Sequence, residues 1–202
     1  MANTKLIDAL VHLDKDAVLA QARGTDFAAV QEDLRAGMEQ MLSAYEQRTR
    51  SLVEVRDASV ITNETLALLA EETGSEITYL GTMLICTVMN DVHKAGKIMT
   101  SDLLRSIGID VTDLGEQVPP EKIVEALQKT GAPVLGLSGL VSSCIEPMKL
   151  TVDAVRAAGL NTFITIGGGQ ASEDLRRYAK ADAVSIDMVG CARILQKFFA
   201  GK

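Results

Sequence analysis

The residues best suited to chemistry are an aspartate and a histidine two positions apart, Asp91 and His93. A carboxylate that reaches one ring nitrogen of a histidine fixes the tautomer and raises the basicity of the other nitrogen, as it does for metal-ligating histidines. A surface pair in a turn explains the same spacing, so both interpretations stay open on this motif alone. The other histidine, His12, falls in a helical segment and is expected to be structural or exposed.

A second motif is the glycine triplet Gly167–Gly169. Glycines that follow a strand let the backbone approach a nucleotide closely, with the amides of the next helix facing phosphate. The same triplet also fits a plain turn before a helix. Because the spacing is not G-x-G-x-x-G, a dinucleotide cofactor is not favoured.

Both motifs follow segments typical of strands, within an alternating pattern of strands and helices. Short apolar runs predict strands at residues 82–89, 109–114, 134–137, 162–166 and 183–186. Amphipathic segments predict helices at residues 97–107, 120–130, 145–159, 172–180 and 189–199. Near-continuous apolar strands separated by helices indicate a doubly wound parallel sheet with right-handed crossovers. Ligands of such sheets bind beyond the carboxyl ends of the strands, so the polar and glycine-rich loops should gather at one edge.

The N-terminal part has a helical pattern instead. Apolar residues recur at a helical period over Thr4–Gln21, over a stretch that Thr25 or Asp26 could cap, and over Asn63–Glu72. Residues 48–62 between the last two segments give no clear pattern. The expected fold class is therefore α/β. An N-terminal helical bundle over residues 1–78 should precede a flavodoxin-like, doubly wound, five-stranded parallel sheet over residues 79–202.

Composition excludes several classes of protein. Of the 202 residues 47% are hydrophobic and 23% charged, which is ordinary for a globular protein. No apolar run reaches the roughly 18 residues of a membrane span, and the N-terminus does not resemble a secretory signal. The three cysteines form neither a disulfide framework nor a zinc pattern, so we expect a cytoplasmic protein. The net charge of −7 falls within residues 1–78, and without a basic face we expect no nucleic-acid partner.

The spacing of three loop motifs is more specific than any one of them. D-x-H-x-x-G ends at Gly96, S-x-L runs from Ser138 to Leu140, and G-G begins at Gly167. The separations are 41 and 26 residues. This composite resembles the signature of base-off, histidine-on corrinoid-binding domains, a cobalamin-binding family that includes methionine synthase and the corrinoid proteins of methyltransferase systems. The resemblance covers about residues 82–200.

The resemblance implies a role for each motif residue. His93 would coordinate cobalt from below in place of the dimethylbenzimidazole base, and Asp91 would bond its far nitrogen; these two are the candidate catalytic residues. The candidate cofactor-binding residues are His93 with Gly96, Ser138, Leu140, Ser142, Gly167 and Gly168. The implied cofactor is cobalamin in its methylcobalamin and cob(I)alamin states, bound base-off and histidine-on.

The sequence departs from the family pattern at three places. Cys144 stands where the hydrogen-bond relay usually ends in Ser or Thr, and a thiol is a weak hydrogen-bond partner. The relay could stop at Asp91 or be completed by Ser142, Ser143 or water. Lys94 and Ile98 stand where an acidic residue and Asn are common.

The N-terminal helices resemble the cap of methyl-carrying members. On that register Tyr45 and Leu52 match cap residues above the upper cobalt face. Met38, Met41 and Tyr45 fit the core of a helical bundle equally well, and this alternative stays open.

The resemblance implies a corrinoid protein that carries a methyl group on cobalt between two partner proteins. A donor-specific methyltransferase would load the methyl group, and an acceptor methyltransferase would pass it to tetrahydrofolate or a thiol. A reductive activator could be a further partner. Such a carrier need not be an enzyme alone. Alternatives are a cobalamin-binding sensor or regulator, which the acidic N-terminal part disfavours, and the small subunit of an adenosylcobalamin-dependent mutase. A flavodoxin-like domain for another nucleotide is the simplest remaining alternative.

Overall fold

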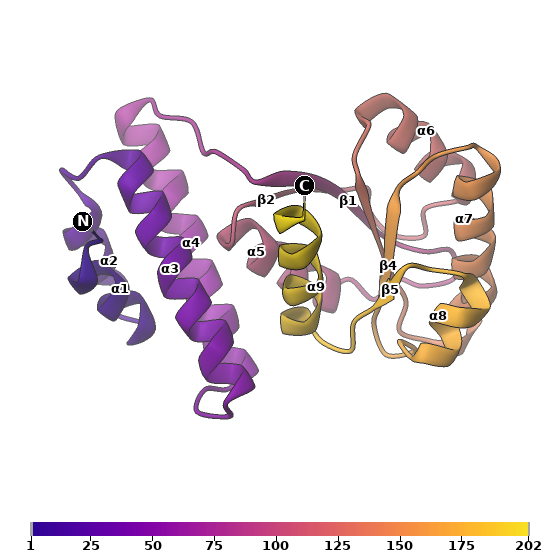
Figure 1. The fold of residues 1–202 in the computed structure, drawn as a ribbon, viewed down its shortest axis with the longest axis horizontal. Helices are drawn as coiled ribbons and strands as arrows, with labels where there is room; N and C mark the ends of the chain where they lie inside the picture. The colour runs from indigo at the N-terminus through magenta and orange to yellow at the C-terminus, as the bar shows by residue number, and fades with distance from the viewer. Residues whose placement is uncertain (1, 202) are drawn as a thin grey trace. The chain divides into compact units, whose positions relative to one another are not determined.

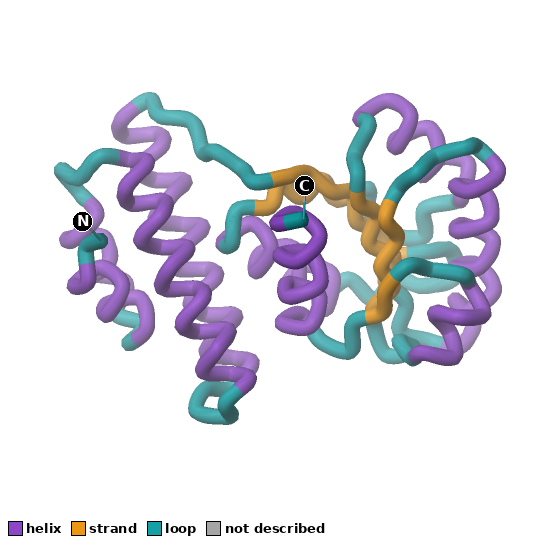
Figure 2. Tube along the Cα trace, in the orientation of Figure 1, coloured by secondary structure: helices purple, strands orange, loops and turns teal. Residues whose placement is uncertain are grey.

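The computed structural model describes residues 2–201, which form two compact units. One unit contains the residues up to Tyr79 together with Asp102–Ile109, and the other contains Leu80–Ser101 and Asp110 onward. Figures 1 and 2 show the helices of the first unit and the sheet of the second. No helix among the described residues is both long enough and apolar enough to cross a bilayer.

The first unit is helical. Its helices are α1 (Thr4–Val11), α2 (Lys15–Ala22), α3 (Phe27–Glu46) and α4 (Leu52–Thr73). The periodic segment from Thr4 to Gln21 is thus two helices and not one. The break lies at Leu13, whose φ of 59° is left-handed, and Asp14 then caps α2 by accepting from the Ala17 N–H.

Local capping explains where α3 and α4 begin. Asp26 caps α3 by accepting from the Ala29 N–H. Thr25 and Asp26 are the two predicted candidates for this cap. Residues 48–62, which gave no clear pattern, include the start of α4. Ser51 accepts from the Glu54 N–H, and the Glu54 carboxylate accepts from the Ser51 N–H at 2.7 Å, a reciprocal capping box.

The second unit contains the sheet. The strands are β1 (Gly81–Thr87), β2 (Ile109–Asp113), β3 (Val134–Ser138), β4 (Phe163–Gly167) and β5 (Ala183–Val184), in the order β2-β1-β3-β4-β5. The helices that alternate with them are α5 (Ala95–Ser106), α6 (Pro120–Thr130), α7 (Ile145–Ala157), α8 (Glu173–Ala179) and α9 (Met188–Ala200). The end of α5 from Asp102 onward and Ile109 of β2 belong to the first unit. The predicted fold class, helices followed by a doubly wound parallel sheet, is confirmed.

The hydrophobic core of the second unit lies on one face of the sheet, covered by α6, α7 and α8 (Figure 1). We call this the apolar face. Its strand residues are Leu84, Cys86, Leu135, Leu137, Ile164 and Ile166, and its helix residues include Ile123, Met148, Val152 and Leu175. The opposite face carries α9. Two observations place α9 there: the Phe163 and Phe198 rings are 4.8 Å apart, and Ser185 bonds the Cys191 side chain.

Candidate functional site

The loops that follow β1, β3 and β4 meet at the carboxyl edge of the sheet. The Gly139 N–H donates to the Gly167 carbonyl at 3.1 Å, and the Gln170 side-chain amide donates to the Leu140 carbonyl at 3.1 Å. The S-x-L and glycine loops are therefore bonded together. The structure thus brings the predicted loop motifs to one edge, as expected for a doubly wound sheet.

Asp91 links the D-x-H loop to the S-x-L loop. Its side chain is fully buried, whereas that of His93 is 51% exposed. One carboxylate oxygen, Oδ1, accepts from the His93 backbone N–H at 2.8 Å and lies 2.6 Å from His93 Nδ1. The other oxygen, Oδ2, accepts from the Leu140 backbone N–H. Asp91 therefore fixes both the histidine ring and the neighbouring loop.

These contacts determine the charge of the site. Burial alone would raise the pKa of Asp91, but hydrogen bonds from the Leu140 and His93 backbones and from the His93 ring outweigh it and lower the pKa. A carboxylate 2.6 Å from Nδ1 makes this nitrogen the N–H donor. In the neutral ring the lone pair then lies on Nε2. The exposed histidine can use this lone pair to bind a metal ion.

Cys144 lies beside Asp91 without replacing the missing hydroxyl. Its buried Sγ is 3.9 Å from Asp91 Oδ2, and its thiol donates to the Val141 carbonyl. The Ser143 hydroxyl donates to the Asn90 carbonyl at 3.5 Å, and Ser142 is exposed in a short 3-10 turn. Oδ2 of Asp91 is thus held mainly by a backbone N–H.

Gly168 allows the close contact between the S-x-L and glycine loops, and Gly139 allows the packing of the S-x-L loop against Cys144. Gly168 has a left-handed φ of 101°, and a Cβ there would lie 2.3 Å from the Gly139 carbonyl oxygen. A Cβ on Gly139 would lie 2.5 Å from Cys144 Sγ. Sequence reasoning missed Gly139, although a glycine inside S-x-L was a visible signal. A Cβ on Gly96 would meet nothing within 4 Å, and its identity is unexplained.

The face of the sheet under α9 changes in character along the strands. Strand register aligns Met83, Val134 and Phe163 in a first row, then Ile85, Gly136, Thr165 and Ala183, and finally Thr87, Ser138 and Gly167 at the carboxyl ends. Ser185 lies beside Gly167, 3.4 Å from a Cβ built there. We call Thr87, Ser138, Gly167 and Ser185 the edge row. No side chain in it is larger than threonine.

Two hydroxyl groups on this face are buried and have no partner, those of Thr87 and Thr165. The two residues are 0% and 3% exposed. A buried hydroxyl without a hydrogen bond costs about 1–3 kcal/mol, so each is suited to a ligand that supplies the missing bond. Small side chains and unpaired hydroxyls under α9, next to an exposed histidine, fit a cofactor with a bulky polar tail.

Lys97 was not anticipated as a site residue. Its side chain is fully buried, and its Nζ lies 2.5 Å from Asp113 Oδ1 and 2.9 Å from the Gly115 carbonyl oxygen. The ion pair ties the first turn of α5 to the end of β2, and the bond to Gly115 ties it to the loop that follows. Since α5 begins two residues after His93, the pair helps to fix the D-x-H loop. A lysine on an amphipathic helix normally indicates a solvated face, so no pattern in the sequence predicted this burial.

The remaining candidates lie in the first unit. Tyr45 is near the end of α3 and Leu52 is the first residue of α4, and both are half-buried. Met38 and Met41 are fully buried, as expected for bundle core. The cap role of Tyr45 and Leu52 stays a prediction.

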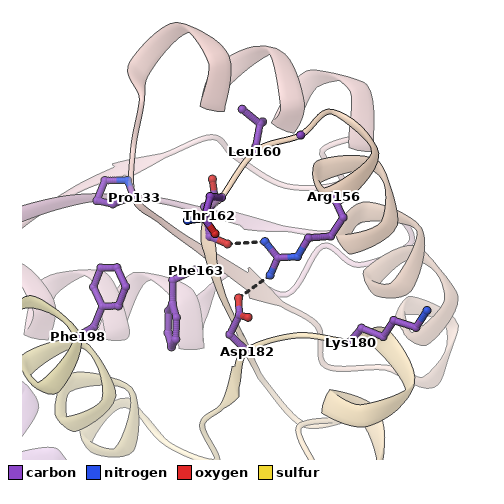
Figure 3. A pocket seen from close by; sticks show the side chains of 10 residues that line it. Pro133, Arg156, Leu160, Thr162, Phe163, Lys180, Asp182 and Phe198 are labelled. Carbon is purple, nitrogen blue, oxygen red and sulfur yellow. Dashed lines mark hydrogen bonds and ion pairs between the residues drawn. The ribbon is translucent and has the colours of Figure 1, made fainter. Parts of the chain in front are cut away.

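A hollow at the opposite, amino edge of the sheet is a weaker candidate (Figure 3). One of its charged residues, Arg156, donates to the Thr162 carbonyl at 2.7 Å and to Asp182 at 2.6 Å. The guanidinium charge is therefore balanced within the hollow itself. Phe163 and Phe198 line one side. The hollow gathers none of the motif residues.

Comparison with known proteins identifies the family. A family model described as the B12 binding domain matches residues 81–192. The chain belongs to this B12-binding family. The resemblance predicted from the spacing of the motifs is thereby confirmed.

Two relatives match nearly the whole chain. Dimethylamine corrinoid protein 1 of Methanosarcina acetivorans is 31% identical over 193 residues, which cover 91% of this chain and 88% of that protein. The dimethylamine corrinoid protein of Methanosarcina barkeri is 28% identical over 192 residues, with 91% and 88% covered.

Solved structures share the fold. The methanol:cobalamin methyltransferase complex MtaBC of Methanosarcina barkeri matches with a TM-score of 0.85 and 23% identity, over 98% of this chain and 79% of that chain. A cobalamin-binding protein from Desulfitobacterium hafniense matches with a TM-score of 0.77 and 24% identity, over 96% and 97%.

Proposed function

We propose that this protein is a corrinoid protein that carries a methyl group between a donor methyltransferase and an acceptor methyltransferase. The observation that carries the proposal is the Asp91–His93 pair, 2.6 Å apart, at the carboxyl edge of a B12-binding fold. Relatives named as dimethylamine corrinoid proteins over 91% of the chain support the carrier role. When bound, the corrinoid would supply cobalt as the group that accepts and releases the methyl.

The residues of the chain have distinct tasks in this proposal. His93 would hold the cobalt through Nε2, and buried Asp91 keeps the proton on Nδ1. This arrangement orients the ring and couples its basicity to the carboxylate. Because Oδ2 of Asp91 is bonded to a backbone N–H, the aspartate stays in place whether or not Cys144 contributes.

The cofactor tail would lie against the edge row and the loops that border it. Ser138, Leu140, Gly167 and Gly168 are the proposed tail-binding residues, with Ser142 and Gly96 at the ends of their loops. Small residues there leave room for a base displaced from cobalt. The resemblance assigns Tyr45 and Leu52 to a cap that shields the upper ligand from water, and we retain that assignment as part of the proposal.

A spectral titration with hydroxocobalamin tests the proposal. Wild type, His93→Ala and His12→Ala would be incubated with the corrinoid, desalted and read in the visible region. His12 is the matched control, because its ring contacts only the local Asp8 carbonyl among the described hydrogen bonds. We expect stoichiometric retention by wild type and His12→Ala, with a spectrum that His93→Ala does not reproduce. Absence of retention by wild type would overturn the proposal.

The partner proteins follow from the same proposal. Residues 1–78 carry 14 acidic and 7 basic side chains, so we propose that a partner with a basic surface docks on this part of the chain in the cytoplasm. Raising the ionic strength should slow methyl transfer from the donor methyltransferase, assayed with methylamines and methanol as donors. A transfer rate that does not change with salt would contradict this docking mode.

A further inference from the structure

The hydroxyl of Thr165, like that of Thr87, is buried in the second unit without a hydrogen-bond partner. Thr165 is the middle residue of β4, only 3% exposed, and its Oγ1 has no hydrogen-bond partner. The side chains before and after it on the strand, Ile164 and Ile166, are aliphatic and belong to the apolar face. A valine would have nearly the same shape as Thr165 without an unpaired polar atom. Packing of the chain itself therefore does not explain the hydroxyl.

On its own face of the sheet, Thr165 is surrounded mainly by small residues. Its register neighbours on the same face are Gly136 on β3 and Ala183 on β5, and Gly167 follows two residues later on β4. Three of its nearest neighbours on this face thus have a small side chain or none. Toward β1, Met83 Cε and Ile85 Cγ1 lie 3.0 and 3.1 Å from a Cβ built on Gly136, so these side chains limit the space on that side.

The depth of Thr165 determines which part of a ligand it can meet. His93 follows β1 beyond the carboxyl edge, whereas Thr165 lies one row deeper than Ser138 and Gly167. A base that lies over the edge row with its ribose end near the edge would direct its far end toward Thr165. At 3% exposure Thr165 is covered in the structure, so a base would reach it only after a movement of α9.

We propose that Thr165 selects corrinoids by the chemistry of their lower base. Its hydroxyl would bond a hydroxyl or amino group at the edge of the base farthest from cobalt, and a base with only methyl groups there would leave it unpaired. This inference rests on the proposed corrinoid-binding function and adds a specificity-determining residue to it.

The test compares two corrinoids that differ only at that edge. The probes are cobalamin, with a 5,6-dimethylbenzimidazole base, and the cobamide with a 5-hydroxybenzimidazole base. Dissociation constants would be measured by spectral titration for wild type, Thr165→Val and Thr165→Ser. Thr62→Val is the matched control, because Thr62 has another buried hydroxyl without a partner but lies on α4 in the first unit.

We expect wild type to bind the hydroxylated cobamide about tenfold more tightly than cobalamin. Thr165→Val should abolish this preference, while Thr165→Ser and Thr62→Val should keep it. In urea denaturation without corrinoid, Thr165→Val should be as stable as wild type or more stable, because it removes an unpaired polar atom. A purely structural role for Thr165 would instead lower the stability of the apoprotein.

Two results would overturn the inference: equal affinity of wild type for both probes, or an unchanged preference in Thr165→Val. If the protein does not bind corrinoids at all, the result would differ, because wild type would then retain neither probe.

Discussion

The two faces of the sheet are built from the same strands yet differ in almost every physical respect. The apolar face packs large aliphatic residues such as Leu137 and Ile166 against α6, α7 and α8, with each strand side chain almost fully buried. The α9 face ends in the edge row of serine, threonine and glycine, with two buried hydroxyls that lack partners. The first face follows the requirements of folding. The α9 face has small side chains and unpaired hydroxyls, and a bound ligand would supply the missing contacts and hydrogen bonds.

Because of this difference, one face of the sheet should contribute mainly to stability and the other mainly to ligand binding. Burial of an aliphatic side chain contributes about 1.5–3 kcal/mol, and the apolar face has many of them. An unpaired hydroxyl subtracts from stability instead. Substitutions on the apolar face should therefore act on the free energy of unfolding, and substitutions on the α9 face should act on corrinoid affinity.

The largest effect is expected on the apolar face. Ile166→Ala would remove a fully buried side chain from β4 and should lower the free energy of unfolding by about 2–5 kcal/mol. Urea denaturation followed by circular dichroism measures this loss, with Ile166→Val as a control expected to lose about 0.5–1.5 kcal/mol. Corrinoid affinity per folded molecule should be unchanged for Ile166→Val. A larger effect of Ile166→Val on corrinoid affinity than on stability would contradict the expectation that the apolar face acts on stability alone.

The next largest effect is expected one residue further along the same strand, at Gly167. A Cβ there would lie 3.4 Å from Ser185 Oγ, a tolerable contact, so Gly167→Ala should change stability by less than about 1 kcal/mol. The added methyl group would stand on the edge row and should weaken corrinoid binding at least tenfold, or about 1.4 kcal/mol. Spectral titration gives the affinity and urea denaturation the stability. Unchanged affinity would show that the tail does not lie on this row.

Much of this organisation could be predicted from the sequence, because buried parallel strands are apolar runs and their loops must meet at one edge. The spacing of Asp91, Ser138 and Gly167 fixed the family through resemblance, and the fold agrees with it. What could not be predicted depends on three-dimensional neighbours. Leu13 breaks the first helical segment through a backbone angle that has no sequence signal. Lys97 is buried because Asp113 and Gly115 are brought to it.

Thr165 shows the same limit. Its position in an apolar strand predicted burial, but the absence of a partner for its hydroxyl depends on the register with Gly136 and Ala183.

A moderate effect is expected for Asp91→Asn. The pKa of Asp91 is lowered in the folded protein, so its ionisation stabilises the fold above the unfolded pKa of about 3.9. That contribution is lost as pH falls through the lower folded pKa. Wild type should therefore exceed Asp91→Asn in stability at pH 7, by about 1 kcal/mol, and the gap should close below pH 4. The pH dependence of urea denaturation checks the sign, with Asp110→Asn on β2 as a control for the loss of one surface charge. A gap that widens in acid would contradict the assigned charge of Asp91.

The smallest effect concerns the motion by which a ligand would enter under α9. Burial raises the pKa of Cys86, on the apolar face, to about 12, and that of Cys191, on α9, to about 11. At pH 8 both are almost entirely thiols, so alkylation by iodoacetamide depends on opening of the structure. If a tail enters between α9 and the edge row, bound corrinoid should slow alkylation of Cys191 by about threefold beyond any change at Cys86. Peptide mass spectrometry resolves the two sites. Equal protection of both cysteines would mean that the ligand stabilises the whole unit, and that the two faces open together rather than separately.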